Sequence, residues 1–508
     1  MPPDRAVVVA IDQGTSSTKA LAVAGDGRVV GRGSAPLAIH APRPGWVEHA
    51  ADDVIASAVS AVADLARSTD LVGVREVGIS NQRESVVLWD RATGAAVSPV
   101  LSWQDRRTTD LCGRLAATGI SDDVRRISGL PLDPMFSAVK VAWLLDAYDP
   151  DRTRSAAGEL CVGTVDSWLA WHLTGQHVIE AGNASRTSLV DLGTGHWSPD
   201  LLAAFDVPIA VLPRVTSSTH DHGPIRALTT LPAGVRLTGI LGDSHAALFA
   251  HRGWQPGIAK ATFGTGSSVM AAVGSHGADR ADGAGAAGSG LCRTIAWHLA
   301  GQSPTLAVEA NILSSGATLA WLAGILGTTP AELAGRAAPD SGEVYFVPAF
   351  NGLGAPWWDS SARALMVGMS LGTTPEHLAR AALDSMVLQV GDVIDAMRTA
   401  GIRPARMVVD GQVTSGIPLM RRLADVIDLP VLVSDVPELS ALGAAWAAGL
   451  GAGRWSLADL ETMPRTYDDV LPGRSGIDAA ALRLGWQDAM ARSRALAPGT
   501  TRQEEQHG

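Results

Sequence analysis

The sequence has little cysteine and no long apolar run. Its 508 residues contain three cysteines, which form no CxxC pair: Cys112, Cys161 and Cys292. This spacing argues against a zinc site and a disulfide framework, and it is typical of a reducing compartment. No stretch reaches the ~18 apolar residues of a membrane span, and the apolar run 6–11 is too short for the core of a signal peptide. We therefore expect a cytoplasmic protein with no membrane partner.

Charged residues are also scarce, at 18% of the chain, and the basic ones are the minority. The formal net charge of −11 argues against a general nucleic-acid binder, because phosphate neutralisation requires clustered cations. Only three of the 40 basic residues are lysines: Lys19, Lys140 and Lys260. Each of them either marks a place that requires a compact ammonium group or occurs there by chance. The hydrophobic content of 46% over this length is enough for two to four domains.

Two common nucleotide-binding motifs are absent or out of context. The P-loop pattern G-x-x-x-x-G-K-[ST] does not occur, which excludes a P-loop NTPase. Residues 283–288 match G-x-G-x-x-G, but a polar segment precedes them where the dinucleotide-binding fold requires a strand. The match therefore does not predict that fold.

The sequence does contain two similar strand–turn–strand segments. The β-branched run Ala6–Ile11 predicts a buried strand, and the residues Asp12–Lys19 predict a polar turn. Residues 262–273 align with residues 12–23 without a gap, and both segments contain Gly-Thr-x-Ser. With the alternation of strand and helix patterns along the chain, this predicts an α/β protein with two duplicated domains. Chance similarity between two turns is the alternative.

The two Gly-Thr-x-Ser turns are candidate phosphate sites. Such turns expose backbone N–H groups and side-chain hydroxyls together, which suits phosphate oxygens. Lys19 would add a cation beside the first turn, and Asp12 would hold Mg²⁺ through water. Two ordinary β-turns are the alternative interpretation.

Polar residues after two further strands are candidates for substrate binding. Asp243 follows a short strand, where its carboxylate would accept a hydroxyl proton or simply cap the next helix. Arg83 and Glu84 follow the strand expected over residues 76–80, and they suit hydroxyl recognition or else form a surface ion pair. Trp103 would form an apolar wall for a polyol, although core packing is the usual role of a tryptophan.

Several ordered stretches extend this pattern over most of the chain, from about Val7 to about Gly449. They are Ile11–Thr15, Gly45–His49, Ile79–Glu84, Gly163–Trp168, Asn183–Thr187 and Pro348–Pro356. Together they resemble the FGGY carbohydrate kinases and, among these, the glycerol kinases. The resemblance implies an α/β fold of two actin/hexokinase-like (ribonuclease H-like) domains that flank a catalytic cleft. ATP would lie against the second domain and the acceptor against the first.

The resemblance also implies domain bounds and residue roles. We expect domains at residues 1–248 and 249–500 and a polar tail at 501–508, and the resemblance is compatible with a homo-oligomer. Asp243 falls on the family's catalytic base, so this role replaces the cap. The acceptor site would comprise Arg83, Glu84, Trp103, Met135, Asp243 and Ser244. The ATP site would comprise Thr15, Ser16, Ser17, Lys19, Thr265, Gly316, Gly411 and Gln412, with Mg²⁺ held by Asp12 and Asp243.

The chain departs from the glycerol kinase pattern on both sides of the expected cleft. On the acceptor side, the departures are Met135 for Tyr, Ser244 and His245 for two Gln, and Ser268 for Phe. They would leave that end of the pocket roomier. On the nucleotide side, the departures are Lys19 for Arg, Ala320 for Gln, Gln412 for Gly and Gly416 for Asn. They would weaken the contacts with the base.

We therefore expect an ATP-dependent kinase that phosphorylates a primary hydroxyl of glycerol or of a related small polyol or sugar. A four- or five-carbon polyol or ketose is the alternative acceptor. A non-catalytic nucleotide-binding sensor on the same fold is the alternative of another class; the nucleotide-side departures favour it, and the intact Asp12 and Asp243 oppose it. An actin-class ATPase would not need the polyol pocket that Arg83, Glu84 and Trp103 predict.

Overall fold

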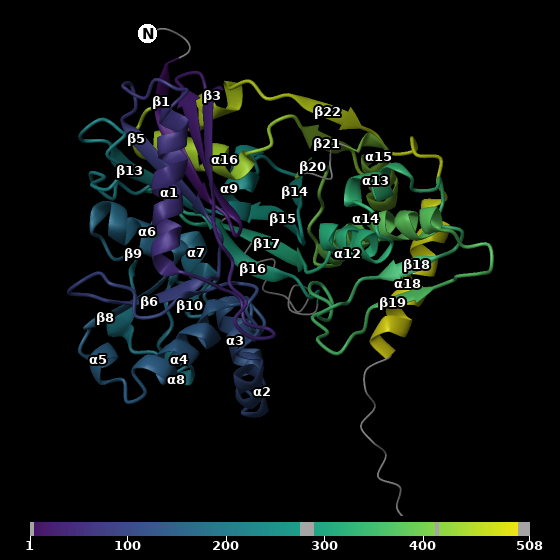
Figure 1. The fold of residues 1–508 in the computed structure, drawn as a ribbon, viewed down its shortest axis with the longest axis horizontal. Coiled ribbons are helices and arrows are strands. Elements are labelled where there is room, and N and C mark those ends of the chain that lie inside the picture. The colour runs from purple at the N-terminus through teal and green to yellow at the C-terminus, as the bar shows by residue number, and fades with distance from the viewer. Residues whose placement is uncertain (1–4, 275–288, 412–415, 496–508) are drawn as a thin grey trace, which may run out of the picture.

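Two mixed β-sheets form the frame of the part of the chain that the structure describes (Figure 1). The structure is a computed structural model, and it describes residues 5–274, 289–411 and 416–495. The sheet of the first half has the strand order β13 (Arg236–Gly242), β5 (Glu76–Asn81), β1 (Ala6–Gln13), β2 (Ser17–Ala24) and β3 (Val29–Pro36). Strand β1 is antiparallel to β2 and parallel to β5, which is itself parallel to β13.

The sheet of the second half repeats this arrangement. Its order is β16 (Cys292–Trp297), β17 (Thr305–Ile312), β15 (Ser267–Gly274), β14 (Ile258–Phe263), β20 (Arg406–Asp410), β21 (Val431–Ser434) and β22 (Tyr467–Val470). Strand β14 is antiparallel to β15 and parallel to β20, so its neighbours correspond to those of β1. This correspondence supports the duplication predicted from the two turns.

The described residues also form one smaller sheet and three short strand pairs. A further sheet of the first half has the order β4 (Glu48–His49), β7 (Val100–Leu101), β6 (Val86–Asp90) and β8 (Leu160–Thr164). The short strand pairs are β9 (Val178–Glu180) with β12 (Arg214–Thr216), β10 (Val190–Asp191) with β11 (His196–Trp197), and β18 (Tyr345–Val347) with β19 (Leu365–Val367).

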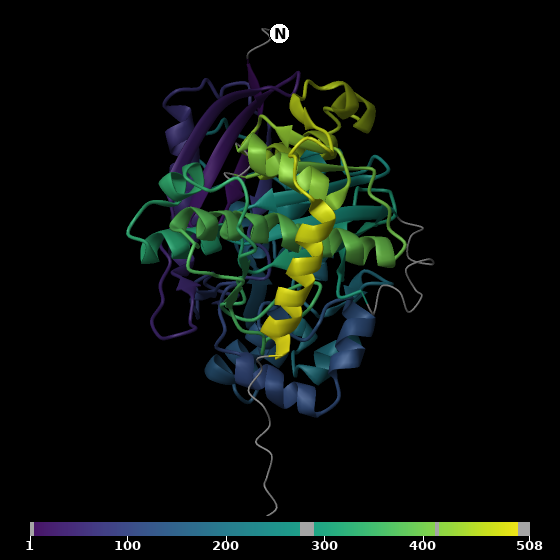
Figure 2. The same cartoon turned by 90° about the vertical axis from the view of Figure 1, so that its right-hand side faces the viewer.

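The helices of the first half are α1 (Ala51–Ala66), α2 (Thr109–Ala117), α3 (Ser121–Ser128), α4 (Ser137–Tyr148), α5 (Thr153–Ala156), α6 (Val165–Thr174), α7 (Ala181–Ser185), α8 (Pro199–Ala204) and α9 (Asp243–Ala250). Those of the second half are α12 (Gly316–Ile325), α13 (Pro330–Gly335), α14 (Pro375–Thr399), α15 (Ile417–Ile427), α16 (Leu439–Gly451), α17 (Leu457–Thr462) and α18 (Ala479–Ala495). Figure 2 shows α18, in yellow, along the outer face of the second half, where it contacts α15 and β18.

Helices α9 and α16 lie between the two sheets and join them in one core (Figure 1). Val8 of β1, Met270 of β15 and Trp446 of α16 belong to the same buried cluster. Helix α16 comes from the second half yet packs on the first sheet, and it approaches so closely that a Cβ on Gly78 would lie 2.1 Å from the carbonyl oxygen of Ala444. Glycine in β5 and the many alanines of α16 therefore permit this contact.

The position of α9 and α16 bears on two expectations. The domain boundary expected between residues 248 and 249 falls inside α9, and it stays a prediction. Among the described residues, no helix is long and apolar enough to cross a membrane. The Ala-rich segment of α16 is core, as its composition predicts.

The first turn is shorter than the sequence predicts. Strand β1 continues to Gln13 and β2 begins at Ser17, so Asp12 and Lys19 are strand residues that face each other across the ladder. The polar composition of this segment conceals the pairing, because it is the strand partners that make these residues extend. The turn itself is closed by the Gly14 N–H, which donates to the carbonyl oxygen of Ser17 at 3.0 Å.

Candidate functional site

A cavity of about 310 Å³ lies between the two halves, where both hairpin turns and several strand ends meet. Strands β1, β5 and β13 are parallel, so the segments that follow them emerge at the same edge of the sheet. The turn of β14 and β15 and the end of β17 form the facing wall. Eight predicted site residues line the cavity: Thr15, Ser16, Arg83, Glu84, Trp103, Asp243, Ser244 and Thr265.

Asp243 places a carboxylate in this cavity. It is the first residue of α9, with Gly242 in the cap position, so Asp243 lies within the helix and does not cap it. Its Oδ1 accepts hydrogen bonds from Arg83 Nε at 3.0 Å and from the Ser244 N–H at 2.6 Å. The side chain is 39% exposed, so the carboxylate is held in place and remains accessible to a ligand.

A buried ion network holds Arg83 beside Asp243. Glu309 of β17 accepts two hydrogen bonds from the Arg83 guanidinium, at 2.8 and 2.7 Å. Arg186 donates to Glu84 at 2.6 Å and also lies 3.0 Å from Glu309. Burial alone would raise the pKa of Glu309, but Arg186 and Arg83 outweigh it and hold that pKa well below its ordinary value. The network therefore joins the first half to the second through paired charges.

Sequence reasoning missed Arg186 and Glu309 as site residues. Arg186 lies in a stretch that carries the family resemblance, but nothing local to it predicts its partner. Glu309 is a single charge in the otherwise apolar segment 306–310 of β17. A charge in a buried strand requires a partner, so the sequence around Glu309 predicts a buried ion pair.

His245 lies behind this network and carries no charge at neutral pH. Its Nε2 is 3.4 Å from Arg83, and the side chain is fully buried. Burial and the positive charge of Arg83 lower its pKa well below the ordinary value. His245 therefore fills space beside Arg83 without weakening its pairing with Glu309.

Trp103 links the first Gly-Thr-x-Ser turn to the acceptor wall, by which we mean the part of the cavity lined by Arg83, Glu84 and Trp103. The indole Nε1 of Trp103 donates to Thr15 Oγ1 at 3.0 Å, and Ser16 is exposed at the tip of the turn. Ser17 and Lys19 lie in β2 and do not line the cavity. The indole thus has a polar partner as well as an apolar face.

Asp12 is the last residue but one of β1, next to this turn. Its Oδ1 accepts from Ser80 Oγ at 2.8 Å. Burial and, to a smaller extent, the nearby charge of Asp243 raise the pKa of Asp12 to about 6, against the opposing effects of Ser80 and Lys19. Two carboxylates that repel each other in this way are a suitable donor set for a divalent cation.

The second turn is held by the backbone of α12. The N–H groups of Ser315 and Ala317 donate to the carbonyl oxygen of Thr265, at 2.9 and 3.0 Å. The N–H of Gly316 donates to Gly264 at 3.0 Å. Gly411, with φ of 107°, packs over the end of β14, where a Cβ would lie 2.1 Å from the carbonyl oxygen of Phe263. Gly316 and Gly411 therefore lie against this hairpin although neither lines the cavity.

Two predicted residues lie elsewhere or cannot be placed. Met135 is 3% exposed and does not line the cavity; its sulfur accepts from Asn311 Nδ2 at 3.5 Å. Gln412 lies outside the described residues. Asn311 of β17 does line the cavity, and the sequence reasoning missed it.

One of the three lysines occupies a place that suits a compact ammonium group. Lys140 of α4 is buried, and its Nζ donates to the carbonyl oxygens of Glu84, Met135 and Phe136. Glu84 has the left-handed φ of 64°, so this contact supports strained backbone at the cavity wall. Burial lowers the pKa of Lys140 to about 8.

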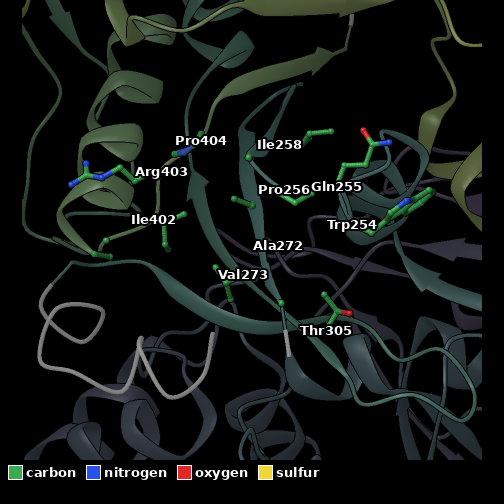
Figure 3. Close-up of a pocket in the computed structure, with 16 residues that line it drawn as sticks. Trp254, Gln255, Pro256, Ile258, Ala272, Val273, Thr305, Ile402, Arg403 and Pro404 are labelled. Carbon is green, nitrogen blue, oxygen red and sulfur yellow. The ribbon is translucent and has the colours of Figure 1, made fainter. Parts of the chain in front are cut away.

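A larger cavity, of about 700 Å³, lies at the other end of β14 and β15 (Figure 3). Its wall is mainly apolar, with Trp254, Val273 and Ile402 among its side chains, and Arg403 supplies a charge. No residue predicted for the site lines it. The acid, the arginine and the two turns expected for phosphoryl transfer converge only at the smaller cavity among the described residues.

Comparison with known proteins identifies the family of this chain. The N-terminal domain model of the FGGY family of carbohydrate kinases matches residues 7–250, and its C-terminal domain model matches residues 259–452. A glycerol kinase of Aromatoleum aromaticum is 41% identical over 96% of this chain and 98% of its own length. A glycerol kinase of Symbiobacterium thermophilum is 38% identical over 97% and 99%. The solved structure of Plasmodium falciparum glycerol kinase with ADP is 27% identical, with a TM-score of 0.85 over 96% and 98% of the two chains.

The chain therefore belongs to the FGGY family of carbohydrate kinases. Within the family it is a glycerol kinase-like, ATP-dependent phosphotransferase, as the sequence predicts. The prediction of two actin-like α/β domains around a cleft is confirmed.

Proposed function

We propose that this kinase transfers the γ-phosphoryl group of ATP to a primary hydroxyl of glycerol or of a related small polyol or sugar. The observation that carries the proposal is the Asp243 carboxylate, which is accessible in the cavity and bonded to Arg83 between the two Gly-Thr-x-Ser turns. The glycerol kinases to which the chain is about 40% identical support the choice of acceptor.

Asp243 acts as the general base. It accepts the proton of the acceptor hydroxyl as the oxygen forms a bond to the γ-phosphorus, and the bond to the bridging β,γ-oxygen breaks so that ADP leaves with its electron pair. Arg83, Glu84 and Trp103 line the same cavity and hold the remaining hydroxyls and the carbon chain. Closure of the cleft excludes water, which would otherwise take the phosphoryl group.

The two turns bind the phosphate groups. Thr15 and Ser16 contribute hydroxyls and amides from the first turn, with Ser17 and Lys19 behind it, and Thr265 contributes from the second. Gly316 and Gly411 keep the second turn in place, and Gln412 retains its assignment to the nucleotide site by resemblance.

Asp12 and Asp243 hold Mg²⁺. Among the described residues no group of three or more His, Cys, Asp and Glu side chains is arranged as a metal site. Mg²⁺ usually takes only one or two carboxylates together with waters and phosphate oxygens, and the repulsion between Asp12 and Asp243 fits this arrangement. When bound, the cation neutralises charge on the phosphate oxygens.

The test is ATP turnover with a panel of acceptors: glycerol, erythritol, threitol, pentitols, dihydroxyacetone, erythrulose and xylulose. Acceptor-dependent release of ADP with formation of a phosphorylated polyol supports the proposal. Nucleotide binding without turnover on any acceptor contradicts it and favours the nucleotide-binding sensor. Strong ATP hydrolysis without an acceptor favours an actin-class ATPase.

A further inference from the structure

The second half supplies two polar side chains, Ser268 and Asn311, to the cavity that Arg83 and Trp103 also line. Ser268 of β15 and Asn311 of β17 are direct cross-strand partners, so both side chains leave the same face of the sheet. Both line the cavity. They form a polar pair that the proton transfer at Asp243 does not use.

The Asn311 amide has hydrogen-bonding capacity that the protein leaves unused. Its Oδ1 is buried and has no hydrogen-bond partner among the described residues. Its Nδ2 donates to the thioether of Met135 at 3.5 Å, and a thioether is a weak acceptor. A buried amide is ordinarily fully bonded, so the Asn311 side chain has capacity for a further hydrogen bond.

Ser268 is poised to accept from a ligand. Its hydroxyl donates to Glu309 Oε1 at 3.1 Å, which fixes the direction of the proton. Glu309 is ionised through its pairing with Arg83 and Arg186, so it can only accept this bond. The lone pairs of Ser268 Oγ are therefore left for a donor in the cavity, such as a hydroxyl group.

The number of polar groups around the cavity sets a minimum size for the acceptor. A three-carbon triol presents one hydroxyl to Asp243 and two more to Arg83 and Glu84. It then has no group left for Ser268 and Asn311. Leaving buried polar groups unpaired is what makes a site reject the smaller analogue.

We propose that Ser268 and Asn311 form a subsite for a fourth or fifth hydroxyl or carbonyl group, and that the preferred acceptor is a linear four- or five-carbon polyol or ketose. This inference rests on the proposed function, and it narrows the acceptor of the same site. Asn311 acts as a specificity-determining residue through both N–H donation and carbonyl acceptance.

The experiment compares kcat/KM for glycerol, erythritol, threitol, pentitols and xylulose in the parent protein and three variants. Asn311→Leu removes the amide at similar volume, and Ser268→Ala removes one hydroxyl. Gln302→Leu is the matched control, because it makes the same amide-to-alkyl change at an exposed position in the turn between β16 and β17.

We expect the parent protein to prefer a four- or five-carbon acceptor over glycerol by at least tenfold. Asn311→Leu should lower that preference at least tenfold, Ser268→Ala should lower it several-fold, and Gln302→Leu should leave it unchanged. A parent preference for glycerol overturns the inference and leaves the kinase proposal standing. An equal loss on all acceptors, or a rise in the KM for ATP alone, also overturns it.

A binding titration of each polyol without nucleotide separates the two proposals. If no acceptor is phosphorylated, tighter binding of the longer polyols that Asn311→Leu abolishes supports the subsite, although the kinase proposal fails. Equal binding of all polyols overturns the subsite. If Asn311→Leu does not fold, Ser268→Ala gives the same decision.

Discussion

The two Gly-Thr-x-Ser hairpins share their strand pairing but differ in what holds them. The first turn is tied by a side chain, through the bond from Trp103 to Thr15. The second turn is tied by backbone, through the amides of Ser315 and Ala317 at the start of α12. The same pattern thus gives one turn that is linked to the acceptor wall and one that is part of a rigid helix start. The two halves thus keep the same hairpin. The residues that contact each hairpin differ, and they determine which ligand it would bind.

The largest expected effect is on kcat, and it concerns Asp243, which lies between the two hairpins. Asp243→Asn keeps the shape of the side chain and removes the base, so kcat should fall by ~10²–10⁴-fold. ADP binding should change little, because in the proposed function the two turns bind the phosphates. Steady-state kinetics and an ADP titration measure both. Asp200→Asn, an exposed change in α8, is the control, and near-normal turnover of Asp243→Asn would remove that residue from the role.

A second test adds one methyl group at each turn and asks whether the second turn tolerates it less well than the first. In Gly316→Ala the new Cβ would lie 2.7 Å from the carbonyl oxygen of Gly264, which is backbone and cannot turn away. Overpacking of this kind costs ~1–3 kcal/mol, so the KM for ATP should rise roughly 5- to 100-fold. Gly14→Ala meets Ser17 at 3.1 Å and should have the smaller effect. A larger effect at Gly14 would reverse the comparison.

Removal of the indole hydrogen bond tests the link of the first turn to the acceptor wall. Trp103→Phe keeps an aromatic wall and loses the bond to Thr15, worth ~1 kcal/mol. The KM values for ATP and for the acceptor should both rise about fivefold. A rise for the acceptor alone would show that Thr15 does not depend on Trp103. The Thr15→Val variant, which removes the same bond from the other side, should raise the KM for ATP equally.

The smallest expected effect is on folding stability, and it concerns the charge of Asp12 beside the first turn. The second turn has no such charge, because Thr262 aligns with Asp12. The pKa of Asp12 is raised from 3.8 to about 6, so the folded state binds this proton more tightly than the unfolded state. Folding stability from Asp12 therefore falls as the pH rises from about 4 through 6. Asp12→Asn should raise the Tm at pH 8 by a few degrees, and the gain should vanish near pH 4. A gain independent of pH would contradict the argument. The measurement is the Tm of both proteins by thermal unfolding between pH 4 and pH 8, without divalent cations.

Local patterns were enough to predict the hairpins and the strand ends that carry Asp243, Arg83 and Glu84. The resemblance supplied the two-domain fold and the cleft. The pairing of Arg83 and Arg186 with Glu309 could not be predicted, because it depends on how β17 faces the first half. The polar neighbours of Lys19 predict a turn, whereas pairing with β1 makes this residue part of a strand. The roles of the individual site residues remain predictions.

The packing of α16 on the first sheet has a consequence for synthesis on the ribosome. The inner face of that sheet, with Val8 and Gly78, is covered by residues 439–451, which are synthesised long after the strands of the sheet itself. The first half cannot complete its own core while the rest of the chain is being made, so the two halves should fold as one cooperative unit. A fragment that ends near residue 255 should be insoluble when produced alone. Co-expression with the remaining residues should recover it, and a stable, soluble fragment would contradict this dependence.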